Sequence, residues 1–143
     1  MVLAPMLKDD GKIIGDFSLS RLDDDSFPII GSGIAESYHV RWFLAHLLDT
    51  SDVEINSLGL DLVGLTLAGP KSRDVLQSCV RVDISHDSMR FMAIKQIDIG
   101  MIPAIVGRVS YTGDLGYEIW VAPAYLNSLF DQFNFGESLG QYI

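Results

Sequence analysis

One predicted hairpin places a carboxylate and an indole on the same side of a strand. Glu118 and Trp120 are two residues apart, so alternation puts them opposite the apolar Tyr117, Ile119 and Val121. A carboxylate can accept two parallel hydrogen bonds from a flat heterocycle with adjacent N–H donors, such as the 2-amino group and N3–H of a pterin. Burial of the carboxylate without such a ligand would leave an unpaired charge. The spacing by itself is more typical of an ordinary surface hairpin, and both interpretations stay open at this point.

Two further patterns could form sites, but each has a simpler structural explanation. Residues 31–33 read Gly-Ser-Gly before a predicted helix, yet Glu36 stands where a dinucleotide fingerprint needs its third glycine and would repel a pyrophosphate. His39 and His46 are seven residues apart on that helix, which separates them by about 10 Å along its axis, too far to share one metal ion. We therefore expect a plain loop and two surface histidines.

The acidic run and the single cysteine do not suggest a metal or redox site. Residues 23–25 are all aspartate, but they lack the glycine and terminal glutamate of a calcium loop. Cys79 has no partner for an internal disulfide, and no Cys/His cluster offers four zinc ligands. We expect a solvated turn at 23–25, a small buried side chain at Cys79 and no bound metal.

The elements that position these residues follow from periodicity and turn signals. Alternation predicts strands over 13–22, 27–31, 53–58, 61–67, 91–97, 102–111 and 117–121. Helices are predicted over 35–48, 71–80 and 124–133, the last two opened by prolines. In the first helix, the face carrying Tyr38, Trp42, Ala45 and Leu48 is expected in the core. Repeated hairpins with interspersed helices indicate an α+β fold with mostly antiparallel sheets and packed helices.

Length and charge narrow the class of protein further. The 143 residues, 48% of them apolar, correspond to one domain, so we expect a single domain over 1–143. Ten basic against nineteen acidic residues give a net charge of −9, which disfavours nucleic acids and anionic membrane surfaces as partners. No run approaches the roughly 20 apolar residues of a membrane helix, and the first residues do not resemble a secretion signal. We expect a cytoplasmic protein.

Residues 111–118 read Y-T-G-D-L-G-Y-E and resemble the Y-T-G-E/D-x-G-F/Y-E signature of the folate-dependent aminomethyltransferase family. That family includes the glycine-cleavage T-protein and the folate-binding region of dimethylglycine and sarcosine dehydrogenases. Residues 4–16 are similar to its M-L-N-x-x-G-G-I-x-x-D segment, and residues 65–72 to its L-x-G-P-K-[AS] segment. The resemblance spans nearly the whole chain, and residues 15–22 lean toward the dehydrogenase-associated branch.

The resemblance implies roles for individual residues. Asp16 falls on the family's catalytic carboxylate, and Tyr111 and Glu118 fall on residues that contact the pterin. The implied chemistry is transfer of a one-carbon unit from a small amine-derived donor to tetrahydrofolate, with FAD only in a separate oxidase domain. Without the resemblance, Asp16 is interpreted as an exposed strand aspartate beside Ser18 and Ser20.

The chain also departs from the family pattern. Leu3 replaces an expected tyrosine, and an expected asparagine is missing near Ser32. The resemblance further implies a fragment of the folate-binding fold, without its N-terminal portion and C-terminal barrel. We therefore expect missing domains or a second copy of the chain to cover apolar surface. The alternative functions are a non-catalytic folate-binding module and a structural fragment that self-associates.

Overall fold

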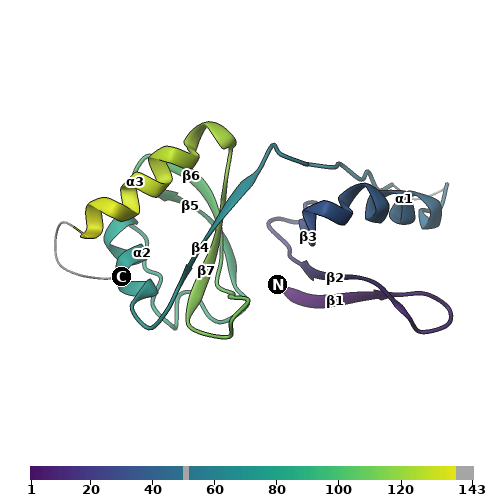
Figure 1. Cartoon of the computed structure of the whole chain (residues 1–143), viewed down its shortest axis with the longest axis horizontal. Helices are drawn as coiled ribbons and strands as arrows, with labels where there is room; N and C mark the ends of the chain where they lie inside the picture. Colours follow the sequence, from purple (N-terminus) through teal and green to yellow (C-terminus); the bar gives the residue numbers. More distant parts are fainter. Residues whose placement is uncertain (50–51, 138–143) are drawn as a thin grey trace. The chain divides into compact units, whose positions relative to one another are not determined.

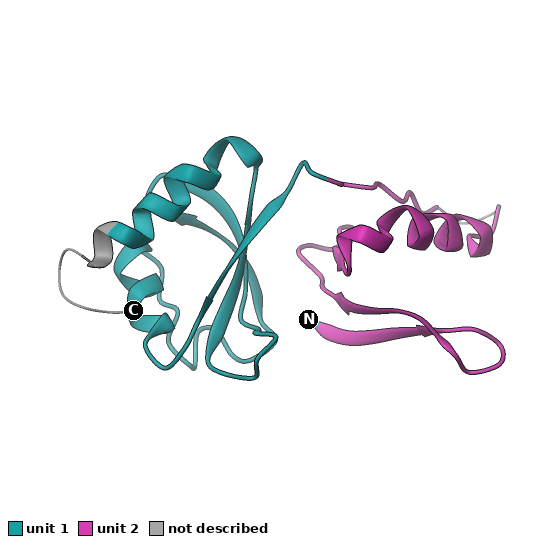
Figure 2. Cartoon of the chain, in the orientation of Figure 1, with its two compact units in different colours: residues 1, 60–143 teal, residues 2–59 magenta. Residues whose placement is uncertain are grey.

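The computed structural model describes residues 1–49 and 52–137, and the chain divides into two compact units. Unit 1 consists of Met1 and the chain from Leu60 onward, and unit 2 consists of Val2–Gly59 (Figure 2). Each unit contains one antiparallel sheet and at least one helix. The predicted α+β class with mostly antiparallel sheets is therefore confirmed.

Unit 2 is a three-stranded sheet with one helix. Its elements are β1 (Val2–Leu7), β2 (Ile13–Leu19), β3 (Ile29–Ile30), the 3-10 turn η1 (Gly33–Ala35) and α1 (Glu36–His46), with sheet order β1-β2-β3. Strand β1 has no counterpart in the sequence prediction. It contains Pro5, which has no N–H for a sheet ladder, and it lies at the edge of the sheet, where a proline is tolerated.

The buried part of unit 2 is small. The Phe17 ring is buried and meets the imidazole of His39 edge-on, with 4.8 Å between ring centroids. His39 Nε2 lies 3.2 Å from the carbonyl oxygen of Ile14. The surface position predicted for His39 is therefore wrong, since this ring closes the core against β2. The predicted core face of α1 is also wrong, because Tyr38 and Leu48 are exposed.

Unit 1 is a four-stranded antiparallel sheet with two helices (Figure 1). Its elements are β4 (Val63–Ala68), α2 (Ser72–Cys79), β5 (Ile94–Ile99), β6 (Ile102–Gly107), β7 (Gly116–Val121), the 3-10 turn η2 (Pro123–Tyr125) and α3 (Leu126–Glu137). The sheet order is β4-β7-β6-β5, which makes β7 a central strand.

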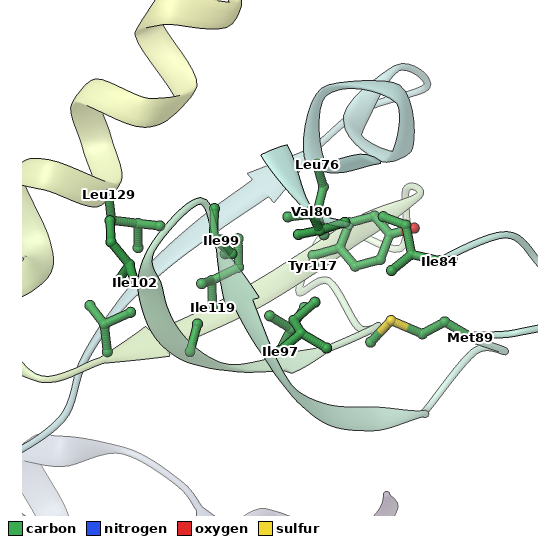
Figure 3. Packing of buried hydrophobic residues seen from close by; sticks show 13 residues of the cluster. Leu76, Val80, Ile84, Met89, Ile97, Ile99, Ile102, Tyr117, Ile119 and Leu129 are labelled. Carbon is green, nitrogen blue, oxygen red and sulfur yellow. The ribbon is translucent and has the colours of Figure 1, made fainter. Parts of the chain in front are cut away.

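The core of unit 1 lies between the sheet and its helices. Leu76 from α2 and Leu129 from α3 meet the sheet side chains of Ile99, Tyr117 and Ile119 in one buried cluster (Figure 3). All five are fully buried. Both helices cover this inner face, so the side chains of β7 that point the other way lie on an outer face that no described helix of unit 1 covers (Figure 1).

One predicted strand is absent. Residues 53–58 form no strand, and part of this segment is bound by a side chain instead of a sheet. Ser57 Oγ and the Gly59 amide donate to a carboxylate oxygen of Glu36, over 2.5 and 2.9 Å. These hydrogen bonds lower the pKa of the Glu36 carboxyl below its ordinary value, and the bond from Ser57 contributes most.

Candidate functional site

The outer face of unit 1 carries Glu118 and Trp120, as alternation predicts. Tyr117, Ile119 and Val121 are buried on the inner face, whereas Glu118 and Trp120 are half-buried on the other. Glu118 lies opposite Thr66 in β4 and Gly107 in β6. Its neighbour in β4 is a threonine, and its neighbour in β6 is a glycine, over which the Trp120 indole and Met1 Sδ lie.

The Glu118 carboxylate is partly removed from water, and no described group of unit 1 replaces the lost hydrogen bonds to water. Burial raises the pKa of this carboxyl above its ordinary value. Within the described part of unit 1, no cation or hydrogen-bond donor contacts it. A half-buried acceptor of this kind suits a ligand that brings its own N–H donors.

Trp120 lies across the same face. An ideal Cβ built on Gly64 would lie 3.1 Å from Cδ1 and 3.3 Å from Nε1 of the indole, and one built on Gly107 would lie 3.2 Å from Cη2 and Cζ3. Gly64 belongs to β4 and Gly107 to β6, the two strands that flank β7. The long axis of the indole therefore crosses β7 close to the sheet.

Tyr111 occupies the loop between β6 and β7 and is 99% exposed. Its ring is thus not packed against Glu118 or Trp120. A cavity of about 240 Å³ opens beside this loop, and its lining does not include Tyr111. The lining residues are Phe91, Arg108, Val109, Ser110, Gly113, Asp114, Leu115 and Gly116.

Asp16 lies in β2 of unit 2, opposite Pro5 of β1. Its side chain is exposed, and its neighbours Gly15 and Phe17 are buried on the other face. The four predicted site residues thus divide between the two units, three in unit 1 and Asp16 in unit 2. The structure brings Glu118 and Trp120 together on one face.

The sequence prediction missed Gly64 and Gly107. Each interrupts a strand pattern on the side opposite the apolar positions, and an isolated glycine within a strand often marks close approach by another group. That signal was available, but it does not say which group approaches.

The remaining candidates match ordinary structure. His46 is exposed, as predicted, and its Nδ1 lies 2.8 Å from the carbonyl oxygen of Trp42. Residues 23–25 are exposed and form a bend, which confirms the solvated turn. Cys79 is half-buried against the core of unit 1. In the part of the chain that the structure describes, no group of three or more His, Cys, Asp and Glu side chains could hold a metal ion.

Comparison with known proteins gives three kinds of relative. Mitochondrial dimethylglycine dehydrogenase of Homo sapiens is 31% identical over 119 residues, which cover 82% of this chain and 14% of the relative. Sarcosine oxidase subunit alpha of Rhizobium meliloti is 31% identical over 88% of this chain and 13% of its own. Aminomethyltransferase of Alkaliphilus metalliredigens is 28% identical over 83% of this chain and 32% of its own.

The antiparallel α+β fold, the signature loop and these relatives define an aminomethyltransferase-related domain. The chain belongs to the GCVT N-terminal domain family, whose model matches residues 1–140. It spans between about one eighth and one third of the length of the three relatives. None of the helices among residues 1–49 and 52–137 has the length and apolar character needed to cross a membrane.

Proposed function

We propose that this chain is the tetrahydrofolate-binding part of an aminomethyl-transfer unit related to the aminomethyltransferases and dimethylglycine dehydrogenases. The observation that carries the proposal is the half-buried Glu118 carboxylate beside the Trp120 indole on the outer face of unit 1, without a hydrogen-bond donor or cation among the described residues of that unit. Membership of the GCVT N-terminal domain family supports the same proposed function. The whole chain, from residue 1 to residue 143, is proposed to act as one functional module.

Glu118 is proposed to bind the pterin ring of the folate. Its two oxygens accept the adjacent N–H donors of the ring edge, which replaces the hydrogen bonds to water that burial removes. Trp120 contributes aromatic surface beside this edge. Tyr111, exposed in the loop before β7, is proposed to close over the ring once it is bound.

Asp16 is proposed as the catalytic carboxylate. Bound tetrahydrofolate supplies the nitrogen nucleophile that receives the one-carbon unit. Asp16 accepts the proton that this nitrogen loses as its bond to the carbon forms, and the donor amine leaves as the old carbon–nitrogen bond breaks. The carboxylate also stabilises the positive charge that develops as the carbon moves. Its exposed position on β2 leaves the carboxylate accessible to a ligand. The donor is proposed to be a small amine-derived one-carbon compound, and no residue of this chain is assigned to FAD.

A self-associating structural fragment is the second candidate, and one observation favours it. Unit 2 exposes several large apolar side chains, among them Leu3 at 69%, Ile13 at 68% and Ile34 at 103%. Exposed apolar surface of this kind suits burial against another chain or domain. Sedimentation velocity across a concentration series distinguishes this candidate, because a structural fragment would self-associate without binding folate. The cytoplasmic location expected from the sequence stays a prediction.

Isothermal titration with tetrahydrofolate tests the main proposal. Glu118→Gln keeps the shape of the side chain but removes its charge, and we expect affinity to fall by about 1–3 kcal/mol. Asp98→Asn is the matched control, since Asp98 is an exposed carboxylate in β5 of the same sheet. This substitution should leave tetrahydrofolate affinity unchanged. Binding should also quench the fluorescence of Trp120. Equal affinities of the wild type and Glu118→Gln would exclude the pterin assignment.

A further inference from the structure

We propose that Gly64 and Gly107 are positioning residues, which allow the Trp120 indole to lie flat and close to the sheet. The indole then forms a platform on which the flat ring of the ligand stacks. The inference rests on the proposed function and adds two residues and a ligand class to the same site. It assigns a purpose to a glycine inside β4, where glycine is normally unfavourable, and to the glycine that ends β6.

The contacts at the two ends of the indole support this role. Gly64 pairs directly with Trp120 across the β4–β7 ladder, and Gly107 pairs with Glu118 across the β6–β7 ladder. A Cβ at Gly64 would meet the pyrrole end of the indole at 3.1 Å, and a Cβ at Gly107 would meet its benzene end at 3.2 Å. Both distances are tighter than ordinary van der Waals contact, so the indole would have to shift by about a few tenths of an ångström to accept a Cβ at Gly64, and the indole or Met1 would have to do so at Gly107.

Backbone conformation does not explain these glycines. The glycines with positive φ are Gly11, Gly59, Gly69, Gly100 and Gly113, all outside the strands. Gly64 and Gly107 have φ values that any L-residue can adopt. Gly64 is also exposed in an edge strand, where a β-branched residue would raise strand propensity. At Gly64 the space taken by the indole is therefore the feature that requires glycine, and at Gly107 the indole shares that role with Met1 Sδ.

The arrangement defines the class of ligand. The indole offers a broad apolar surface, and the Glu118 carboxylate stands two residues away on the same face. A planar heteroaromatic ring with adjacent N–H donors on one edge satisfies both groups at once, by stacking on the indole and donating to the carboxylate. If the Trp120 indole tilted away from the sheet, a ligand stacked on it would no longer reach the Glu118 carboxylate with its N–H edge.

The first part of the test needs no ligand. The chain has two tryptophans, so the measurement uses a Trp42→Phe background in which Trp120 is the single indole. Gly64→Ala should shift the Nε1–H resonance of Trp120 and increase quenching of its fluorescence by iodide. Gly33→Ala is the matched control, because a Cβ at Gly33 meets nothing within 4 Å. Gly64 is the cleaner choice, because a Cβ at Gly107 would also meet Met1 Sδ at 3.2 Å.

The second part measures tetrahydrofolate affinity. Gly64→Ala should weaken binding about 3- to 10-fold, the range of a lost aromatic stacking contact. Thermal unfolding should show no loss of stability, because alanine is the better strand residue. In a Trp120→Leu background, Gly64→Ala should have no further effect on affinity, since the ring it displaces is gone. Gly107→Ala should repeat the pattern and serves as the second variant.

The outcomes separate this inference from the proposed function. If Glu118→Gln weakens binding but Gly64→Ala and Gly107→Ala do not, the platform is wrong and the pterin assignment stands. An unchanged Trp120 resonance in both glycine variants would also overturn the platform. If the wild type does not bind tetrahydrofolate at all, both the proposed function and the platform are wrong.

Discussion

Arg73 Nε on α2 donates a 3.1 Å hydrogen bond to the hydroxyl oxygen of Tyr117 on β7. Tyr117 is fully buried and points away from the face that carries Glu118. Among the described residues, Nη2 of Arg73 is buried without a hydrogen-bond partner. This bond therefore anchors a helix to the strand that carries the proposed ligand site.

Tyr117→Phe should destabilise unit 1 without changing the site. Loss of the acceptor leaves a second guanidinium N–H unpaired, which we expect to lower the free energy of unfolding by about 1–3 kcal/mol. Urea denaturation measures this change. Tetrahydrofolate affinity of the folded protein should stay within about twofold, a margin well under 1 kcal/mol. A stable variant with weakened binding would contradict the separation of the two faces of β7.

Glu118→Gln should change how stability depends on pH. Burial raises the pKa of this carboxyl, so around that pKa the folded state binds more protons than the unfolded state. Its contribution to stability is therefore largest at low pH and declines as pH rises from the ordinary glutamate range, about 4.3, through the raised value. Glutamine removes this decline.

Urea midpoints measured at several pH values, from acidic to neutral, test whether the contribution of Glu118 to stability declines as the pH rises. Relative to the wild type, Glu118→Gln should gain stability as pH rises, even though it binds folate less well. Asp98→Asn is the matched carboxylate-to-amide control, since Asp98 is exposed in β5 of the same sheet. A Glu118→Gln curve that falls below the wild type at neutral pH would mean that the carboxylate has a partner in the folded chain.

Gly15→Ala should destabilise unit 2. An alanine Cβ would lie 2.5 Å from Cζ of Phe17 and 2.8 Å from Nε2 of His39, so the small core must shift to accept it. Overpacking of this kind typically costs about 1–3 kcal/mol. Hydrogen exchange of β2 amides measures the loss, with Gly33→Ala as the control. Unchanged protection would show that the contact between Phe17 and His39 does not hold this unit together.

Asp16→Asn should separate catalysis from binding. Loss of a general acid or base should slow formation of methylenetetrahydrofolate from formaldehyde and tetrahydrofolate by about 100-fold or more, measured above the uncatalysed background. Tetrahydrofolate affinity should change little. Asp9→Asn is the control, since Asp9 is an exposed aspartate in the turn between β1 and β2. Equal rates of Asp16→Asn and the wild type would remove Asp16 from the chemistry.

The sequence predicted unit 1 better than unit 2, for a physical reason. In β7, strict alternation between buried Tyr117 and Ile119 and half-buried Glu118 follows from one face that helices cover and one that no described helix of unit 1 covers. Helix α2 was also predicted within two residues of its ends, because Pro70 marks its start and Leu76 anchors its inner side.

Unit 2 offered weaker signals. Its buried residues include a histidine and a glycine, His39 and Gly15, which periodicity rules count as surface or turn residues. The apolar Tyr38 and Leu48 lie exposed on and after α1, so hydrophobic spacing pointed to the wrong face. At the candidate site, alternation predicted that Glu118 and Trp120 share a face, whereas the contacts of Trp120 with Gly64 and Gly107 depend on strand order, which spacing does not encode.

The central claim is that Glu118 binds the adjacent N–H donors of a pterin, and a double-mutant cycle tests it most directly. The affinities of the wild type and Glu118→Gln are measured for tetrahydrofolate and for its analogue in which hydrogen replaces the 2-amino group. We predict that the analogue binds the wild type more weakly than tetrahydrofolate does, and that Glu118→Gln largely abolishes this difference. If both proteins discriminate equally between the two ligands, Glu118 does not contact that edge of the ring and the account is wrong.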